Sequence, residues 1–92
     1  MENPDLWQGR VCALLYPIQF EKDPVNGVDR VLKQVVKAGA LGATPEEYLL
    51  SVRKALASDV ELARLIPQDH PESVIRAYLA EMERRLQAEE KK

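Results

Sequence analysis

Two helix-start signatures constrain this chain more than any other feature of its sequence. The segment TPEE at 44–47 places a hydroxyl at the N-cap, proline at the first helical position and a glutamate three residues beyond Thr44, which is the pattern of a capping box. The segment DHPE at 69–72 repeats the arrangement, with Asp69 as the expected cap and Glu72 as the reciprocal acceptor. Apolar residues of helical period follow both signatures, so the sequence predicts a helical domain.

Periodic apolar residues in the rest of the chain predict further helices. We expect helices over residues 4–16, 28–38, 45–57 and 71–89, and a short helix over 59–66 that Ser58 or Asp59 caps. Pro17 is expected to end or kink the first helix, because its nitrogen cannot donate a hydrogen bond. A short strand within residues 12–20 is the alternative there. Gly39 is expected to cap the end of the second helix.

The connections between these helices are short, which favours antiparallel neighbours. The predicted fold is therefore all-α: a small antiparallel helical bundle of four main helices plus one short helix. With 92 residues, the chain is expected to form a single helical domain over residues 1–88, followed by a frayed C-terminal tail over 89–92.

Composition and charge exclude several broad classes of protein. Apolar residues make up 46% of the chain and charged residues 30%, which is ordinary for a globular domain and unlike a disordered chain. The net charge of −2 comes from intermixed acidic and basic residues, so no basic block indicates phosphate binding. The acidic N-terminus does not resemble a secretory signal, and the longest apolar run, Val11–Tyr16, is far too short to span a membrane. We therefore expect a cytoplasmic location and no membrane partner.

One cysteine, Cys12, and one histidine, His70, leave little material for catalysis. A nucleophilic enzyme needs a base near its nucleophile, and a zinc site needs clustered cysteine and histidine ligands. We interpret Cys12 as a small buried apolar side chain in a reducing compartment, and His70 as an exposed residue at a helix start. The sequence thus predicts no catalytic residues, no metal and no cofactor, in a protein that is not an enzyme.

A basic stripe is one candidate for partner binding. Arg30, Lys33 and Lys37 fall on roughly one face of the helix predicted over 28–38. Three interpretations of this stripe are open: a face exposed to solvent, a contact surface for an acidic protein, or a weak nucleic-acid-binding surface. The recognition helix of a helix-turn-helix motif needs basic side chains, whereas the helix over 59–66 offers two acidic residues and one arginine. Nucleic acid is therefore the less favoured partner.

Apolar side chains supply two further candidates. Ile18 and Phe20 follow Pro17 in a less regular stretch, where we expect them to form an exposed apolar patch. The helix over 71–89 carries an apolar stripe that either packs into the core or pairs with the same stripe of a second copy in a homodimer, and core packing is favoured. This stripe consists of Val74, Ile75, Tyr78, Leu79, Met82 and Leu86.

Function follows by elimination. A mixed-charge helical domain without catalytic groups is best explained as a non-enzymatic protein-binding module. We expect a small inhibitor or adaptor of one protein partner, comparable in size and helicity to bacterial immunity proteins and antitoxins. The expected partner-binding residues are Ile18, Phe20, Arg30, Lys33 and Lys37. The alternatives are a dimeric nucleic-acid-binding regulator that uses the basic stripe, and a structural subunit of a homo-oligomeric assembly that associates through helix 71–89.

Overall fold

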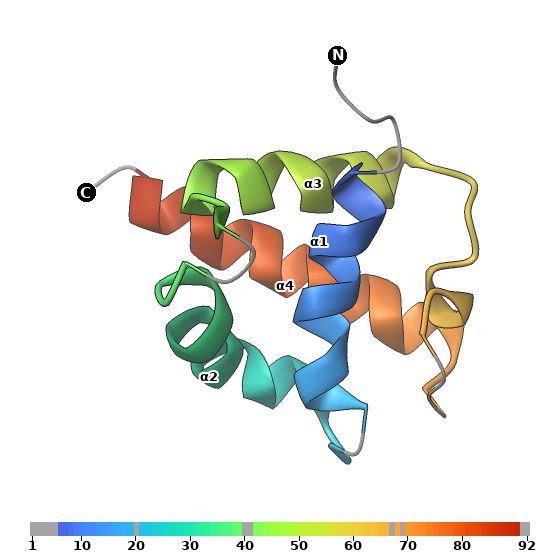
Figure 1. Cartoon of the computed structure of the whole chain (residues 1–92). Coiled ribbons are helices and arrows are strands. Elements are labelled where there is room, and N and C mark those ends of the chain that lie inside the picture. The colour runs from blue at the N-terminus through green and yellow to red at the C-terminus, as the bar shows by residue number, and fades with distance from the viewer. Residues whose placement is uncertain (1–5, 20, 40–41, 67, 69, 91–92) are drawn as a thin grey trace.

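The computed structural model describes residues 6–19, 21–39, 42–66, 68 and 70–90 (Figure 1). Within these residues there are four α-helices and no strand. The α-helices are α1 (Leu6–Leu15), α2 (Val28–Val31), α3 (Pro45–Ala57) and α4 (Glu72–Glu90). Shorter helical turns join them: η1 (Tyr16–Ile18), η2 (Pro24–Gly27) and η5 (Leu62–Arg64) are 3₁₀ turns, and η3 (Leu32–Val36) is a π-helical segment that continues α2. The all-α prediction is confirmed. The strand alternative is wrong for the described residues 12–19, which are helical up to Ile18 and end in a turn.

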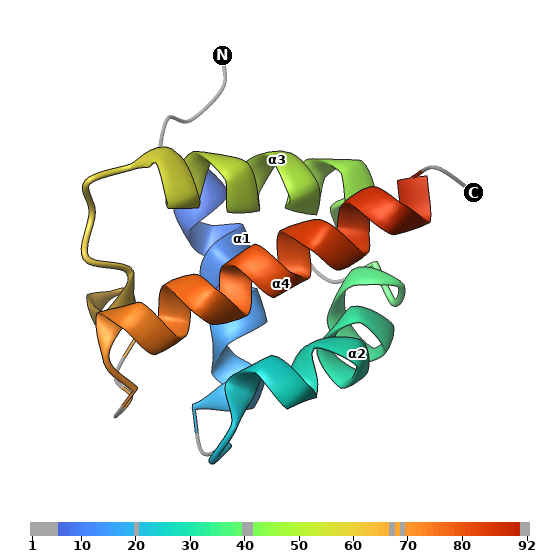
Figure 2. The ribbon, with the colours of Figure 1, turned by 180° about the vertical axis from the view of Figure 1, so that it is seen from behind.

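The helices cross instead of lining up as a bundle. α3 lies along one edge of the molecule, and α4 packs beside it in roughly the opposite direction (Figure 1). α1 crosses this pair, and α2 with η3 lies on the other side of α4 from α3, as the view from behind also shows (Figure 2). The predicted antiparallel arrangement is therefore not confirmed, because α1 does not run alongside α3 and α4.

One apolar core lies where α1, α2 with η3, α3 and α4 meet, and its burial is the main source of stability. Each large aliphatic side chain moved out of water there contributes roughly 1.5–3 kcal/mol. Tyr78 also donates a buried hydrogen bond from its hydroxyl to the carbonyl oxygen of Leu14 (2.6 Å), which fastens α4 to the end of α1. The fully buried larger side chains include Val11, Leu14, Leu15, Ile18, Tyr48, Leu49, Leu62, Ile75, Tyr78, Leu79 and Met82.

The apolar stripe of α4 belongs to this core, as favoured from the sequence. Met82 and Leu86 are both buried by other parts of the same chain. Pairing of this stripe with a second copy in a homodimer would require the core to open, so its burial favours the core interpretation.

Several local signals at the helix ends are confirmed. Thr44 Oγ1 accepts from the Glu47 amide (3.1 Å), and Glu47 Oε1 accepts from the Thr44 amide (3.0 Å), which completes the capping box at the start of α3. α1 ends at Leu15, two residues before Pro17. Gly39, with φ of 73°, adopts the left-handed conformation that favours glycine where a helix ends.

The short helix predicted over 59–66 is wrong in length and in its cap. Only the three-residue turn η5 forms, preceded by Glu61, while Ser58 ends α3 and its hydroxyl donates to the carbonyl oxygen of Ala55 (2.7 Å). The second predicted capping box depends on Asp69, which lies outside the described residues. α4 continues to Glu90 and so includes the first two residues of the predicted tail, and residues 91 and 92 lie outside the described part of the chain.

Candidate functional site

The most site-like feature of the described structure is an open cleft of about 350 Å³. Its lining residues come from η3, the start of α3 and the last turns of α4. These three segments come together at one end of the molecule (Figure 1). The lining residues are Leu32, Val36, Lys37, Thr44, Pro45, Glu46 and Leu86.

The cleft has an apolar floor and a polar rim. Leu32, Val36 and Leu86 form the floor, and they are nearly inaccessible to water because they also pack into the core. Lys37 and Glu46 are exposed and carry opposite charges at the rim. An apolar hollow surrounded by polar groups is the usual anatomy of a site that receives an apolar side chain of a ligand or partner.

The wall formed by η3 has an unusual backbone. The Lys37 amide donates to the Leu32 carbonyl oxygen (2.8 Å), five residues earlier, instead of to the residue four earlier as in an α-helix. Such single π turns are rare and occur frequently at functional sites. The β-branched pair Val35 and Val36 lowers the α-helical propensity of the segment. This low propensity is the one sequence signal that accompanies the change from α-helical to π-helical hydrogen bonding.

Ion pairs near the cleft connect the elements that form its walls. Arg85 of α4 donates to the Asp29 carboxylate of α2 and to Glu81 (3.3 Å), and Arg84 also donates to Glu81 (2.5 Å). The hydrogen bond from Arg84, together with that from Arg85, lowers the pKa of Glu81 to about 2 despite some desolvation. On the other wall, Arg53 of α3 pairs with Glu83 of α4 (3.5 Å). The cleft is therefore bounded by elements that are tied to one another through α4.

The structure separates the residues of the basic stripe. Arg30 pairs with Glu21 and donates to the carbonyl oxygen of Pro17 (3.4 Å), so its charge is directed toward η1. Lys33 is exposed outside the cleft, and Lys37 lines it. Since seven residues of helix span about 10 Å, Arg30 and Lys37 belong to opposite ends of this segment. Only one of the three cations reaches the candidate site.

The predicted exposed apolar patch is wrong at Ile18, which is 0% exposed. The turn η1 continues beyond Pro17 and carries Ile18 into the core, where its carbonyl oxygen lies 3.0 Å from Nε2 of His70. Phe20, the other residue of that patch, lies outside the described residues.

The cysteine and the histidine differ from their predicted environments. Cys12 is half-buried instead of buried, with Sγ 3.8 Å from the carbonyl oxygen of Leu65, and desolvation raises the pKa of its thiol. A raised pKa disfavours the nucleophilic thiolate. His70 is half-buried, not exposed, because its ring faces the Ile18 carbonyl. Among the described residues, no group of histidine, cysteine, aspartate and glutamate side chains could hold a metal ion.

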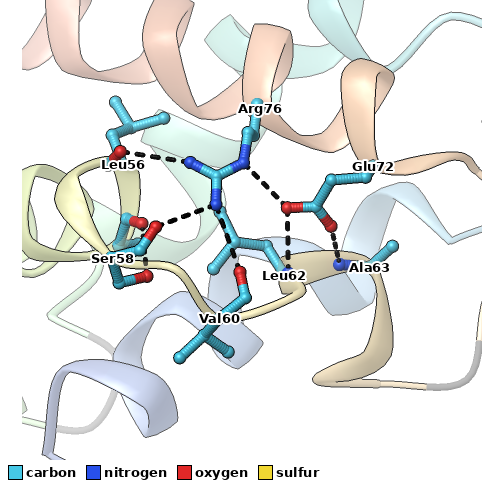
Figure 3. A network of polar contacts seen from close by, with 8 residues as sticks. Leu56, Ser58, Val60, Leu62, Ala63, Glu72 and Arg76 are labelled. Carbon is cyan, nitrogen blue, oxygen red and sulfur yellow. Dashed lines mark hydrogen bonds and ion pairs between the residues drawn. The ribbon is translucent and has the colours of Figure 1, made fainter.

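A second polar cluster surrounds Arg76 (Figure 3). The Arg76 guanidinium donates to Glu72 (2.8 Å) and to three carbonyl oxygens near the end of α3, each at 3.1 Å. Those carbonyls belong to Leu56, Ser58 and Val60. In this arrangement one side chain of α4 satisfies acceptors that the end of a helix leaves open.

Glu72 completes the cluster. Its two carboxylate oxygens accept from the backbone amides of Leu62 (3.1 Å) and Ala63 (2.8 Å), so it caps the start of η5. Desolvation alone would raise the pKa of Glu72, but the two amide hydrogen bonds and Arg76 together lower it. These contacts join α4 to the end of α3 and to η5, so the cluster acts as a structural clamp between them.

No protein-family model matches this chain, no curated protein matches it significantly, and no solved structure matches it significantly. None of the described helices is both long enough and apolar enough to cross a membrane.

Proposed function

We propose that this chain is a non-enzymatic protein-binding module whose cleft receives an apolar side chain of one protein partner. The observation that carries the proposal is the apolar floor of Leu32, Val36 and Leu86 beneath an exposed polar rim. Within that class, a small inhibitor or adaptor of the immunity-protein or antitoxin type remains the function that we favour.

The energetics of a small pocket support this use. Burying one leucine-sized or phenylalanine-sized side chain of a partner contributes roughly 1.5–3 kcal/mol, or about 10- to 150-fold in Kd. Binding energy in protein interfaces is concentrated in such buried anchors, while the rim excludes water. Leu32, Val36 and Leu86 are packed into the core before binding, so the floor of the cleft needs little ordering when the partner docks.

The cleft explains partner binding better than the basic stripe does. Arg30 is already paired with Glu21, whereas Lys37 stands at the rim of an apolar hollow. Lys33 distinguishes the two surfaces, because it belongs to the basic stripe but does not line the cleft. Lys33 and Lys37 therefore provide a matched pair of substitutions, of the same residue type on the same segment.

The test is a pull-down from the cells that make this chain, with the tagged full-length protein at moderate salt. We expect one protein to co-elute stoichiometrically with the wild type and with Lys33→Glu, and to be lost with Lys37→Glu. Circular dichroism of both variants checks that the fold is kept. If both variants lose the partner equally, the basic stripe is the binding surface, and the proposal that the cleft binds the partner is contradicted. Retention by both would contradict the whole proposal.

A further inference from the structure

The outer face of α3 carries a charge pattern that the cleft does not explain. Glu46, Leu50 and Lys54 are spaced four residues apart, so they follow one side of the helix, and all three are exposed. We call these three residues the α3 face. α3 forms one edge of the molecule, with α1, α2 and α4 all on its other side in both views (Figures 1 and 2).

Leu50 stands out on this face. It is 57% exposed, more than any other large apolar side chain in the described part of the chain. Single exposed leucines are common on protein surfaces, so exposure alone indicates nothing. The charges on either side of Leu50 provide the second observation.

Glu46 and Lys54 differ from most charged residues of α3 and α4 in the part of the chain that the structure describes. Most charged side chains on α3 and α4 have partners, including Glu47 with Arg10 and Arg53 with Glu83. Among the described residues, neither Glu46 nor Lys54 takes part in an ion pair. The α3 face therefore presents an unpaired negative charge, an exposed leucine and an unpaired positive charge, in that order.

This order is complementary to itself. If two α3 helices pack in opposite directions about a two-fold axis at Leu50, Glu46 of one copy faces Lys54 of the other on both sides of the axis. Each charge lies about 6 Å along the helix from Leu50, because four residues rise by that distance. A parallel pairing would place like charges together, which is unfavourable. We propose that the α3 face binds the same face of a second copy, in an antiparallel two-fold symmetric homodimer.

The proposed interface is small, so the dimer is expected to be weak and dependent on concentration. The two ion pairs are exposed to solvent, and they select the direction of pairing more than they add affinity. Salt is expected to weaken the dimer, since exposed ion pairs are screened. This proposal uses a different surface from the cleft, and only Glu46 is shared between the two.

Sedimentation of the purified full-length protein from about 20 µM to about 1 mM tests the proposal. We expect the average mass to rise toward that of a dimer for the wild type and to remain that of a monomer for Leu50→Lys. Tyr16→Lys is the matched control, because Tyr16 is 55% exposed but lies in η1, away from the α3 face. That variant is expected to associate as the wild type does.

Charge reversal distinguishes the proposed dimer from nonspecific hydrophobic association. Glu46→Lys alone and Lys54→Glu alone place like charges opposite each other in a homodimer, so each is expected to be monomeric. An equimolar mixture of the two variants restores opposite charges on both sides, so association should return in the mixture. A monomeric wild type over the whole range would overturn the proposal. A mixture that stays monomeric, or a loss of association with Tyr16→Lys equal to that with Leu50→Lys, would also overturn it. Because only this chain is present, none of these results affects the proposed role of the cleft.

Discussion

Replacing Arg76 by alanine is the sharpest test of how this small domain is held together. The substitution removes the donors to Leu56, Ser58 and Val60 and leaves Glu72 without its cation. A hydrogen bond to a charged group contributes about 1.5–3 kcal/mol when water cannot replace it. The Arg76 side chain is 32% exposed, so water will recover part of the loss. We therefore expect the free energy of unfolding to fall by about 2–3 kcal/mol in total.

Arg84→Ala is the matched control for this substitution. Arg84 is on the same helix and pairs with Glu81 three residues earlier, but its side chain is 66% exposed and has no backbone partner in the described structure. Exposed pairs of this kind contribute little to stability, because water solvates and screens both charges. The two variants thus differ in whether the arginine holds the end of α3.

Urea unfolding followed by circular dichroism and by fluorescence of the single tryptophan, Trp7, measures both variants. For a domain of this size, a loss of 2–3 kcal/mol corresponds to a melting temperature lower by roughly 8–24 °C. Arg76→Lys keeps the charge but not the planar set of donors, so we expect it to recover less than half of the loss. A loss for Arg76→Ala no larger than that for Arg84→Ala would refute the reasoning.

Two further predictions concern the backbone and acid stability. Gly9 is exposed within α1, and an added methyl group would meet no atom within 4 Å, so Gly9→Ala should raise stability by about 0.5–1 kcal/mol. Gly39→Ala should instead lower stability by about 1–2 kcal/mol, because φ at Gly39 is +73°. Equal changes in the melting temperatures of the two variants would contradict the left-handed conformation of Gly39. Because the folded-state pKa of Glu72 lies below its usual 4.5, its stabilising effect is present above that pH and is lost as the pH falls through the folded-state pKa. Urea unfolding at decreasing pH should therefore show a smaller acid-induced loss in Glu72→Gln than in the wild type, and identical losses would argue against this role.

Sequence reasoning succeeded where the physical cause was local. The capping box of Thr44 and Glu47 involves residues three positions apart, so the pattern and the contact are nearly the same information. The buried stripe of α4 is similarly visible as a helical period. Pro17 acts through its own missing donor, and α1 does end before it.

Sequence reasoning failed where distant segments decide the outcome. The helix predicted over 59–66 has reasonable local signals, but Arg76 takes the carbonyl oxygen of Val60, and Glu72 takes the amides that begin η5. Ile18 is buried, and its backbone carbonyl oxygen faces the ring of His70, which lies 52 residues later in the chain. A single sequence does not contain these long-range partners.

The cleft was missed for a related reason. Leu32 and Leu86 have the apolar pattern of core residues, and they are core residues; nothing in that pattern indicates where the core opens to solvent. The π turn at η3 has no established sequence signature comparable to a capping box. Of the predicted site residues, Lys37 lines the cleft. The sequence predicts it as a site residue because it shares a helix face with Arg30, but Arg30 pairs with Glu21 and does not line the cleft.

The bond between Tyr78 and Leu14 has a consequence for synthesis of the chain. It joins residues 64 positions apart. Ribosomes add about 5–20 residues per second, so roughly 3–13 s separate the synthesis of Leu14 from that of Tyr78. Throughout that interval the apolar side of α1 has no α4 against which to pack. The speed of translation, more than the intrinsic rate of helix formation, therefore sets how long this segment stays accessible to chaperones and to aggregation.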